Sequence, residues 1–308
     1  MPENLLDRLP IGARVAIVRL RSLGDCVLTT PAIDLLKRAR PDLQIAVVVE
    51  DRFRAVFEKN PSIAAILSPS YAAIARWHPQ LCINFHGGTR SMLLSLTSMA
   101  RWRAGFAHHS GAGLAYNIKI PRAQEILGEE RIVHTAEHLA SAMFYLGVPR
   151  TDIPRAILYA ETRLAAKPYA VIHPVSAAAY KTWHAEGFLA SAEYLASEAA
   201  LEPIFIGAAG DDLSPFSKHR IVQGAALAEV KSLLAGASLF VGNDSGPAHI
   251  AAAFGIPVIV LYGRREHQQI WAPWKTTAAK TFASPDGISA IAVDDVLAAI
   301  AELNPQRA

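Results

Sequence analysis

The chain has 308 residues, of which 52% are hydrophobic and 19% charged, so it is long enough for one large domain or two ordinary domains with separate cores. Its net charge of +3 comes from scattered lysines and arginines, which argues against a nucleic-acid groove and favours an acidic ligand. Cys26 and Cys82 fit no metal-ligand or disulfide pattern, and no stretch approaches the roughly 18 apolar residues of a spanning helix. We therefore expect a cytoplasmic protein that binds no nucleic acid.

Short apolar runs alternate with helical patterns along the first half of the chain. The run "ARVAIVRL" (13–20) is rich in β-branched residues, as is typical of a strand buried on both faces, and a helical pattern follows it. The runs "LQIAVVVE" (43–50) and "QLCINFHG" (80–87) predict further strands, with a helical stretch at "RFRAVFEKN" (52–60). This alternation is typical of βαβ units and a parallel sheet.

The same pattern restarts in the second half. Apolar runs predict strands at 168–174, 201–210, 238–244 and 256–263. Helical patterns occupy the stretches 185–199, 227–237 and 246–255. The second half therefore repeats the architecture of the first.

Two doubly wound parallel-sheet domains in tandem, residues 1–155 and 156–308, account for this order of elements. The boundary falls within 146–168, where prolines and charges interrupt the apolar pattern. Ligands of such sheets bind beyond the carboxyl ends of the strands, so two facing domains would place two sets of loops around one cleft. Candidate functional residues are therefore expected in the loops that follow the strands.

Asp25 lies in the first of these loops, behind Arg21-Ser22-Leu23-Gly24. One interpretation makes Asp25 the N-cap of the following helix, because a carboxylate there accepts hydrogen bonds from free N–H groups. The other makes it a general base for an incoming hydroxyl, since Thr30-Pro31 offers a cap and a first helical position of its own. Both interpretations stay open on these residues alone.

The segment "FVGNDSGPAHIAAAFG" (240–255) combines a strand, a tight turn and the start of a helix. Asp244 and Ser245 are typical cap residues, and Pro247 suits the first helical turn. A helix N-terminus presents free N–H groups and a partial positive charge, so it favours a phosphate, and His249 lies on its first turn. A purely structural turn is the alternative.

Other strand-end loops also carry polar side chains. Ser176 can donate to a phosphate and Lys181 can neutralise one, although a solvated lysine is the simpler interpretation. Asp211 follows the next predicted strand, where a carboxylate can bind ribose hydroxyls. In the first half, His86 and Arg90 follow a predicted strand, and a structural role for the histidine is the alternative.

Metal-dependent and redox chemistry have no signature in this sequence. The histidines form no HExxH motif and no His/Cys cluster with ligand spacing, and the pair His134 and His138, four residues apart, is a poor predictor on its own. There is also no GxGxxG fingerprint, Walker loop or GxSxG elbow. We expect neither a metal nor a cofactor.

The segments "RLRSLGDCVLTTPAIDLLK" (19–37) and "GNDSGPAHIAAAFGIPVIVLYG" (242–263) resemble the signatures of glycosyltransferase family 9, which includes the ADP-heptose:lipopolysaccharide heptosyltransferases. Weaker similarity extends through "INFHGGTRS", "HTAEHLASAMFYLGVP", "HPVSAAAYKTWHAEGF" and "WAPW". The resemblance implies the α/β fold called GT-B, with two Rossmann-like domains facing a cleft. It places the acceptor in the first domain and the nucleotide sugar in the second, and it packs the last helix back on the first domain.

The resemblance also implies roles for the candidate residues. Asp25 would be the catalytic base, and Arg21, His86 and Arg90 would contact the acceptor. The residues implied to bind the nucleotide sugar are Ser176, Lys181, Asp211, Asp244, Ser245, Gly246 and His249. Asp211 occupies the position where the family often has a glutamate facing the ribose. The aspartate keeps the negative charge, but its side chain is shorter and reaches less far.

The implied reaction is an inverting, metal-independent transfer of a heptose or related sugar from an ADP-sugar to an anionic glycolipid acceptor of the lipopolysaccharide-core type. Such an acceptor implies peripheral contact with the inner membrane, and no partner protein is expected. The stretch "RREHQQ" (264–269) departs from the family, which often continues with a Thr-Asp-Pro-like turn. A nucleotide-sugar epimerase on the same fold and a non-catalytic nucleotide-sugar-binding module are the alternatives.

Overall fold

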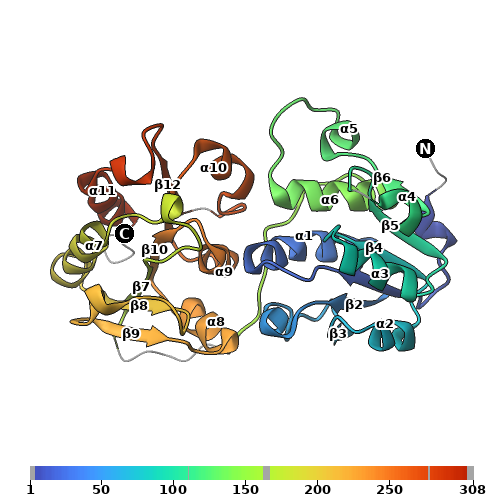
Figure 1. The fold of residues 1–308 in the computed structure, drawn as a ribbon, viewed down its shortest axis with the longest axis horizontal. Coiled ribbons are helices and arrows are strands. Elements are labelled where there is room, and N and C mark those ends of the chain that lie inside the picture. Colours follow the sequence, from blue (N-terminus) through green and yellow to red (C-terminus); the bar gives the residue numbers. More distant parts are fainter. Residues whose placement is uncertain (1–3, 110, 162–166, 277, 304–308) are drawn as a thin grey trace. The chain divides into compact units, whose positions relative to one another are not determined.

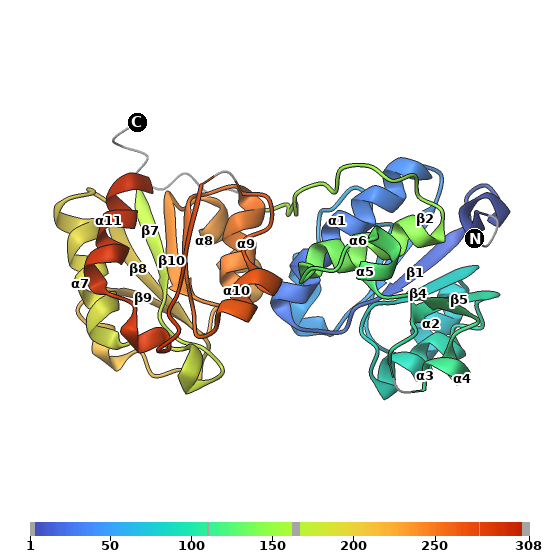
Figure 2. The same ribbon diagram turned by 90° about the horizontal axis from the view of Figure 1, so that it is seen from above.

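The computed structural model describes residues 4–109, 111–161, 167–276 and 278–303. The chain divides into two compact units between Tyr159 and Ala160, within the stretch where the sequence predicts a domain boundary (Figures 1 and 2). Within the described residues each unit holds one six-stranded sheet, and the paired strands run parallel. The prediction of two doubly wound parallel-sheet domains is confirmed.

In the first unit the strands are ordered β3-β2-β1-β4-β5-β6. They are β1 (Arg14–Val18), β2 (Gln44–Val48), β3 (Ala65–Leu67), β4 (Leu81–Asn84), β5 (Trp102–Phe106) and β6 (Ile118–Ile120). The 3-10 and α-helices are η1 (Leu5–Arg8), α1 (Leu23–Ala39), η2 (Asp51–Val56), α2 (Tyr71–Trp77), α3 (Thr89–Thr97), α4 (Ala112–Ala115), α5 (Ala123–Leu127) and α6 (Thr135–Leu146). Helices α1 and α6 cover one face of the sheet and α2 and α3 the other (Figure 2). Because β1 is central and covered on both faces, its apolar run is continuous.

In the second unit the strands are ordered β12-β11-β10-β7-β8-β9. They are β7 (Tyr169–His173), β8 (Glu202–Gly207), β9 (Arg220–Gln223), β10 (Leu239–Asn243), β11 (Val258–Tyr262) and β12 (Ala279–Ala283). The helices are η3 (Ala179–Lys181), α7 (Ala185–Ser197), η4 (Ser214–Phe216), α8 (Leu227–Ala235), α9 (Gly246–Phe254), α10 (Arg265–Trp271), η5 (Ile288–Ala290) and α11 (Val293–Leu303). The central strands β7 and β10 both end at the edge that carries the predicted donor-binding loops.

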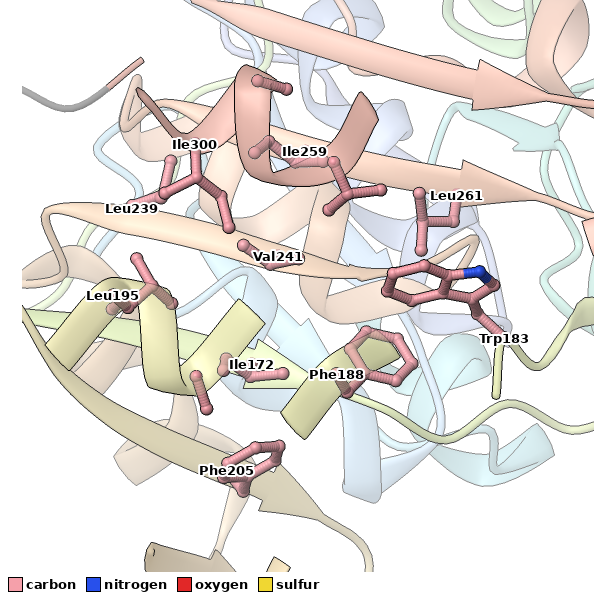
Figure 3. Close-up of a cluster of buried hydrophobic side chains, with 14 of the residues drawn as sticks. Ile172, Trp183, Phe188, Leu195, Phe205, Leu239, Val241, Ile259, Leu261 and Ile300 are labelled. Carbon is pink, nitrogen blue, oxygen red and sulfur yellow. The ribbon is translucent and has the colours of Figure 1, made fainter. Parts of the chain in front are cut away.

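Trp183 lies in the main core of the second unit, next to Phe188 and Leu261 (Figure 3). Its ring packs edge-on against Phe188 with centroids 5.2 Å apart, and its Nε1–H donates to the Ile291 carbonyl at 3.1 Å. Its backbone N–H donates to Asn243 Oδ1 at 3.1 Å. These contacts fasten the segment that carries Lys181 to the core and to the end of β10.

Helix α11 also packs into this core. Its buried residues Val296, Ala299 and Ile300 belong to the same apolar cluster, and the helix contacts α7 and β11. These contacts lie within the second unit. The packing of the last helix on the first domain, which the resemblance implies, stays a prediction. Among the described helices none is both long and apolar enough to cross a membrane.

Helix α1 begins earlier than the sequence predicts. Its N-cap is Ser22, so Thr30 and Pro31 lie inside the helix and do not start it. Pro31 lacks the N–H that would bond the Val27 carbonyl, and the Thr30 hydroxyl donates to that carbonyl instead, at 2.8 Å. This local replacement explains how the helix continues through a proline.

Candidate functional site

A cavity of about 570 Å³ opens at the carboxyl ends of β1, β2 and β4 in the first unit. Its lining residues are Arg19, Arg21, Ser22, Asp25, Arg52, Phe53 and His86. This is the edge of the sheet where ligands of doubly wound folds bind. The structure therefore brings together three of the predicted residues, Asp25, Arg21 and His86.

Asp25 lines this cavity from the first turn of α1. Its Oδ2 accepts hydrogen bonds from the Ser22 N–H at 3.2 Å and from the Ser22 hydroxyl at 2.9 Å. Asp25 is therefore not the N-cap itself, but the third helical residue, which bonds back to the cap. These bonds fix the carboxylate at the cavity wall, so the capping role and the general-base role are compatible.

Arg19 is a cavity residue that the sequence analysis missed. Its side chain is buried, with 7% of the residue exposed, and its Nε has no hydrogen-bond partner among the described residues. Burial lowers the pKa of the guanidinium, while the nearby Asp25 carboxylate acts against that shift. Burying an unpaired charge costs several kcal/mol of folding free energy, and a bound anionic ligand would offset this cost. The only signal in the sequence is an arginine at the end of an apolar run.

The other predicted acceptor residues differ in position. His86 is half-buried, and burial together with the Arg19 charge lowers the pKa of its imidazole. Arg90 does not line the cavity and donates to the Pro69 carbonyl at 3.1 Å. Arg52 occupies the cavity wall instead, in an ion pair with Glu50 at 2.8 Å.

The histidines of the first unit do not form a metal site in the described part of the chain. His134 is the N-cap of α6, and its Nδ1 accepts from the Ala136 N–H at 3.1 Å. His138 stacks on Phe106 with centroids 4.1 Å apart, and burial lowers the pKa of its imidazole to about 4. Across the described residues no three His, Cys, Asp or Glu side chains are grouped so that they could hold a metal ion.

Lys181 and Asp244 form the centre of the candidate site in the second unit. Lys181 Nζ lies 2.7 Å from Asp244 Oδ2, although the two residues come from η3 and from the end of β10. Their side chains are 20% and 7% exposed, respectively, so the pair is largely shielded from water. The structure thus joins two residues that the sequence could only place in separate loops.

Helix α9 starts next to this pair. Its N-cap Ser245 makes no side-chain capping bond, and its Oγ instead lies 3.0 Å from His173 Nδ1. Ser245 therefore does not cap the helix that begins at Gly246, and the helix N-terminus keeps the partial charge that favours an anion. His249, on the first turn, is buried with 7% exposure.

Ser176 and Asp211 have different surroundings. Ser176 is half-buried in the loop after β7, and its predicted contact with a phosphate stays a prediction. Asp211 Oδ2 accepts from the Ala208 N–H at 2.6 Å and so closes the turn after β8. Asp211 therefore has a local structural role, and its predicted contact with a ribose stays a prediction.

Comparison with known proteins identifies the family. The model of glycosyltransferase family 9 (heptosyltransferase) matches residues 78–286, which is more than half of the chain. The chain belongs to glycosyltransferase family 9. It is 25% identical to lipopolysaccharide heptosyltransferase 3 of Escherichia coli strain K12, over 94% of this chain and 97% of that protein. It is 24% identical to lipopolysaccharide heptosyltransferase 1 of Pseudomonas aeruginosa, over 81% of this chain and 78% of that protein.

Solved structures agree with the GT-B fold of this family 9 glycosyltransferase. A family 9 glycosyltransferase from Veillonella parvula superposes with a TM-score of 0.80 at 20% identity, covering 96% of this chain and 97% of the other. ADP-heptose lipopolysaccharide heptosyltransferase II of E. coli superposes with a TM-score of 0.78 at 16% identity, covering 96% and 99%. At these identities the likeness establishes the fold alone.

The family 9 enzyme should lose stability in mild acid because of His173. Burial lowers the pKa of this imidazole to about 4, from an ordinary value of 6.5. Between these values the unfolded chain binds the proton and the folded chain does not, so stability falls as pH decreases, by at most about 1.4 kcal/mol per pH unit. Urea unfolding at pH 7, 6 and 5 should show a shallower decline in His173→Gln than in wild type. Parallel declines in the two proteins would contradict this role.

Proposed function

We propose that the chain transfers a heptose or related sugar from an ADP-sugar to a lipopolysaccharide-core-type acceptor, with inversion and without a metal. The observation that carries this proposal is the Lys181–Asp244 pair beside the uncapped start of α9. A cation and a helix N-terminus at one sheet edge suit the diphosphate of a nucleotide sugar. A transfer reaction also needs a base for the acceptor hydroxyl, and the first unit supplies a carboxylate, Asp25, in a cavity.

The names of related proteins support the choice of donor and acceptor. A solved E. coli heptosyltransferase, WaaC, contains ADP and superposes on 94% of this chain with a TM-score of 0.76. The curated relatives with similar sequences are lipopolysaccharide heptosyltransferases. We therefore infer an ADP-sugar donor and a glycolipid acceptor, the latter met at a membrane surface.

In the proposed reaction the acceptor hydroxyl loses its proton to the Asp25 carboxylate as its oxygen attacks the anomeric carbon. The bond from that carbon to the phosphate oxygen breaks, and ADP leaves with the electron pair from the opposite face. A single displacement therefore inverts the configuration. Lys181 and the N-terminus of α9 would stabilise the charge that develops on the leaving diphosphate, which is the task that a metal has in other transferases.

The cationic lining of the first-unit cavity supports an anionic acceptor. Arg19, Arg21 and Arg52 line the cavity together with the Asp25 carboxylate, and among the described residues only Arg52 of these three forms an ion pair with an acid, Glu50. A phosphate or carboxylate on the acceptor would offset the unpaired charge of Arg19 in particular. This arrangement favours an acidic glycolipid over a neutral sugar.

Replacing Lys181 with alanine tests the donor site. Loss of a charge-assisted contact should weaken ADP binding by about 1.5 to 3 kcal/mol in calorimetry. The exposed Lys218 provides a matched control, since Lys218→Ala removes the same charge elsewhere in the second unit.

The double variant Lys181→Ala/Asp244→Asn separates lost attraction from repulsion by the unpaired Asp244 carboxylate. Part of the affinity should return in the double variant if repulsion contributes. If Lys181→Ala bound ADP with wild-type affinity, Lys181 would not be part of the donor site.

A further inference from the structure

Helix α10 places a histidine against the Lys181–Asp244 pair. His267 Nδ1 lies 4.0 Å from Asp244 Oδ2, the same oxygen that accepts from Lys181 Nζ. The His267 side chain is 17% exposed, and its Nδ1 is a buried atom without a hydrogen-bond partner among the described residues. A buried ring nitrogen that faces a carboxylate without bonding to it is well placed to take up a proton.

The same segment adds a cation and an aromatic ring. The guanidinium carbon of Arg264 lies 4.9 Å from the centroid of Tyr180, the residue before Lys181. The centroid of Trp271 lies 5.5 Å from Lys181 Nζ. Trp271 and His267 therefore lie near Lys181, and Arg264 lies against the neighbouring Tyr180. The segment 264–271 includes the stretch where this sequence departs from the family pattern.

Hydrogen bonds hold α10 in this position. Gln268 Nε2 donates to the Thr281 carbonyl at 3.2 Å and to its hydroxyl at 2.8 Å, on β12. The Tyr262 hydroxyl, at the end of β11, donates to the Trp271 carbonyl at 2.8 Å. Helix α10 is thus held at its middle and at its C-terminal end.

The charges at this site are nearly balanced without a ligand. Lys181 is paired with Asp244, and the nearby charges of Arg264 and Glu266 have opposite signs. Burial, Lys181 and Arg264 lower the pKa of His267, against the opposing influence of Asp244 and Glu266, so its imidazole is neutral at pH 7. A diphosphate carries several negative charges and would need more positive charge than Lys181 alone supplies.

We propose that Arg264 and His267 bind the diphosphate of the nucleotide donor together with Lys181. This inference rests on the proposed function of the second unit and adds two residues to it. The Arg264 guanidinium offers paired N–H donors to phosphate oxygens. A phosphate at His267 Nε2 favours the imidazolium, whose new Nδ1 proton would face Asp244. Donor binding should therefore take up a proton.

Calorimetry with ADP tests this proposal. Titrations at pH 7 in two buffers of different ionisation enthalpy should show proton uptake by the wild type. His267→Gln should abolish the uptake and weaken binding more at pH 6 than at pH 8. Arg264→Ala should weaken binding about tenfold, as expected for an exposed charge-assisted contact. Arg265→Ala is the matched control, because it removes the same charge from an exposed neighbour, and it should bind ADP like the wild type.

The outcomes separate this inference from the proposed function. ADP binding with wild-type affinity in Arg264→Ala and His267→Gln, or proton uptake that persists in His267→Gln, would overturn the inference alone. Absence of ADP binding by the folded wild type would overturn the ADP donor, and this inference with it. Thermal unfolding of each variant followed by circular dichroism confirms that the compared proteins are folded.

Discussion

The variant Asp25→Asn is expected to transfer sugar about 10² to 10⁴-fold more slowly than the wild type while it binds ADP with unchanged affinity. Asparagine keeps the size of the side chain and an oxygen that can accept from Ser22, but it cannot take a proton from the acceptor hydroxyl. The rate of ADP release in the presence of acceptor measures the loss. Because the amide oxygen of asparagine can still accept both hydrogen bonds from Ser22, thermal stability should change little.

Ser22→Ala is the matched control for this prediction. It removes the 2.9 Å hydrogen bond from the Ser22 hydroxyl to Asp25 but leaves the carboxylate in place. If capping alone matters, Ser22→Ala should reduce transfer as much as Asp25→Asn does. If Asp25 is the base, the control should retain most of the activity, and a fully active Asp25→Asn would exclude that role.

Trp183→Ala is expected to destabilise the second unit by about 3 to 5 kcal/mol. The substitution removes one of the largest fully buried side chains and its bond to the Ile291 carbonyl. Urea unfolding followed by circular dichroism measures the change, and ADP affinity should fall as well, because Trp183 fastens the segment that carries Lys181.

Trp183→Phe separates the packing contribution from the hydrogen bond. Phenylalanine keeps most of the apolar volume but leaves the Ile291 carbonyl without this donor, so a smaller loss of about 1 to 2 kcal/mol is expected. The first unit does not contain Trp183, so its unfolding should be unaffected. An unchanged unfolding midpoint in Trp183→Ala would show that this core is not needed for stability.

The central strands could be predicted from the sequence, whereas the edge strands could not. Buried strands such as β1 and β10 appear as continuous apolar runs because both of their faces are covered. The edge strands β3 and β9 are short and only partly buried, so they lack that signal. Neither of the two helix starts that the sequence offered, Asp25 as N-cap or Thr30-Pro31, is the start of α1, whose N-cap is Ser22. Thr30-Pro31 resembles a helix start, and only the structure shows the Thr30 hydroxyl donating to the Val27 carbonyl.

The candidate site was predictable to the extent that it follows strand ends. Asp25 and Asp244 each come soon after a central strand, and the rule for doubly wound sheets places such residues at the ligand-binding edge. Arg19 is buried with its Nε unbonded, and His267 approaches Asp244, because segments that are distant in the sequence pack together. No local sequence pattern encodes these contacts, so only the folded structure reveals them.

Incubation of the protein with ADP-heptose and a lipopolysaccharide-core acceptor that lacks the added heptose tests the central claim most directly. The proposed mechanism predicts that ADP is released only when acceptor is present, that EDTA does not suppress the release, and that nuclear magnetic resonance shows the product with inverted anomeric configuration. Conversion of the donor without acceptor would indicate an epimerase, and donor binding without any turnover would indicate a non-catalytic module. Either result, or a product with retained configuration, would contradict the proposed reaction.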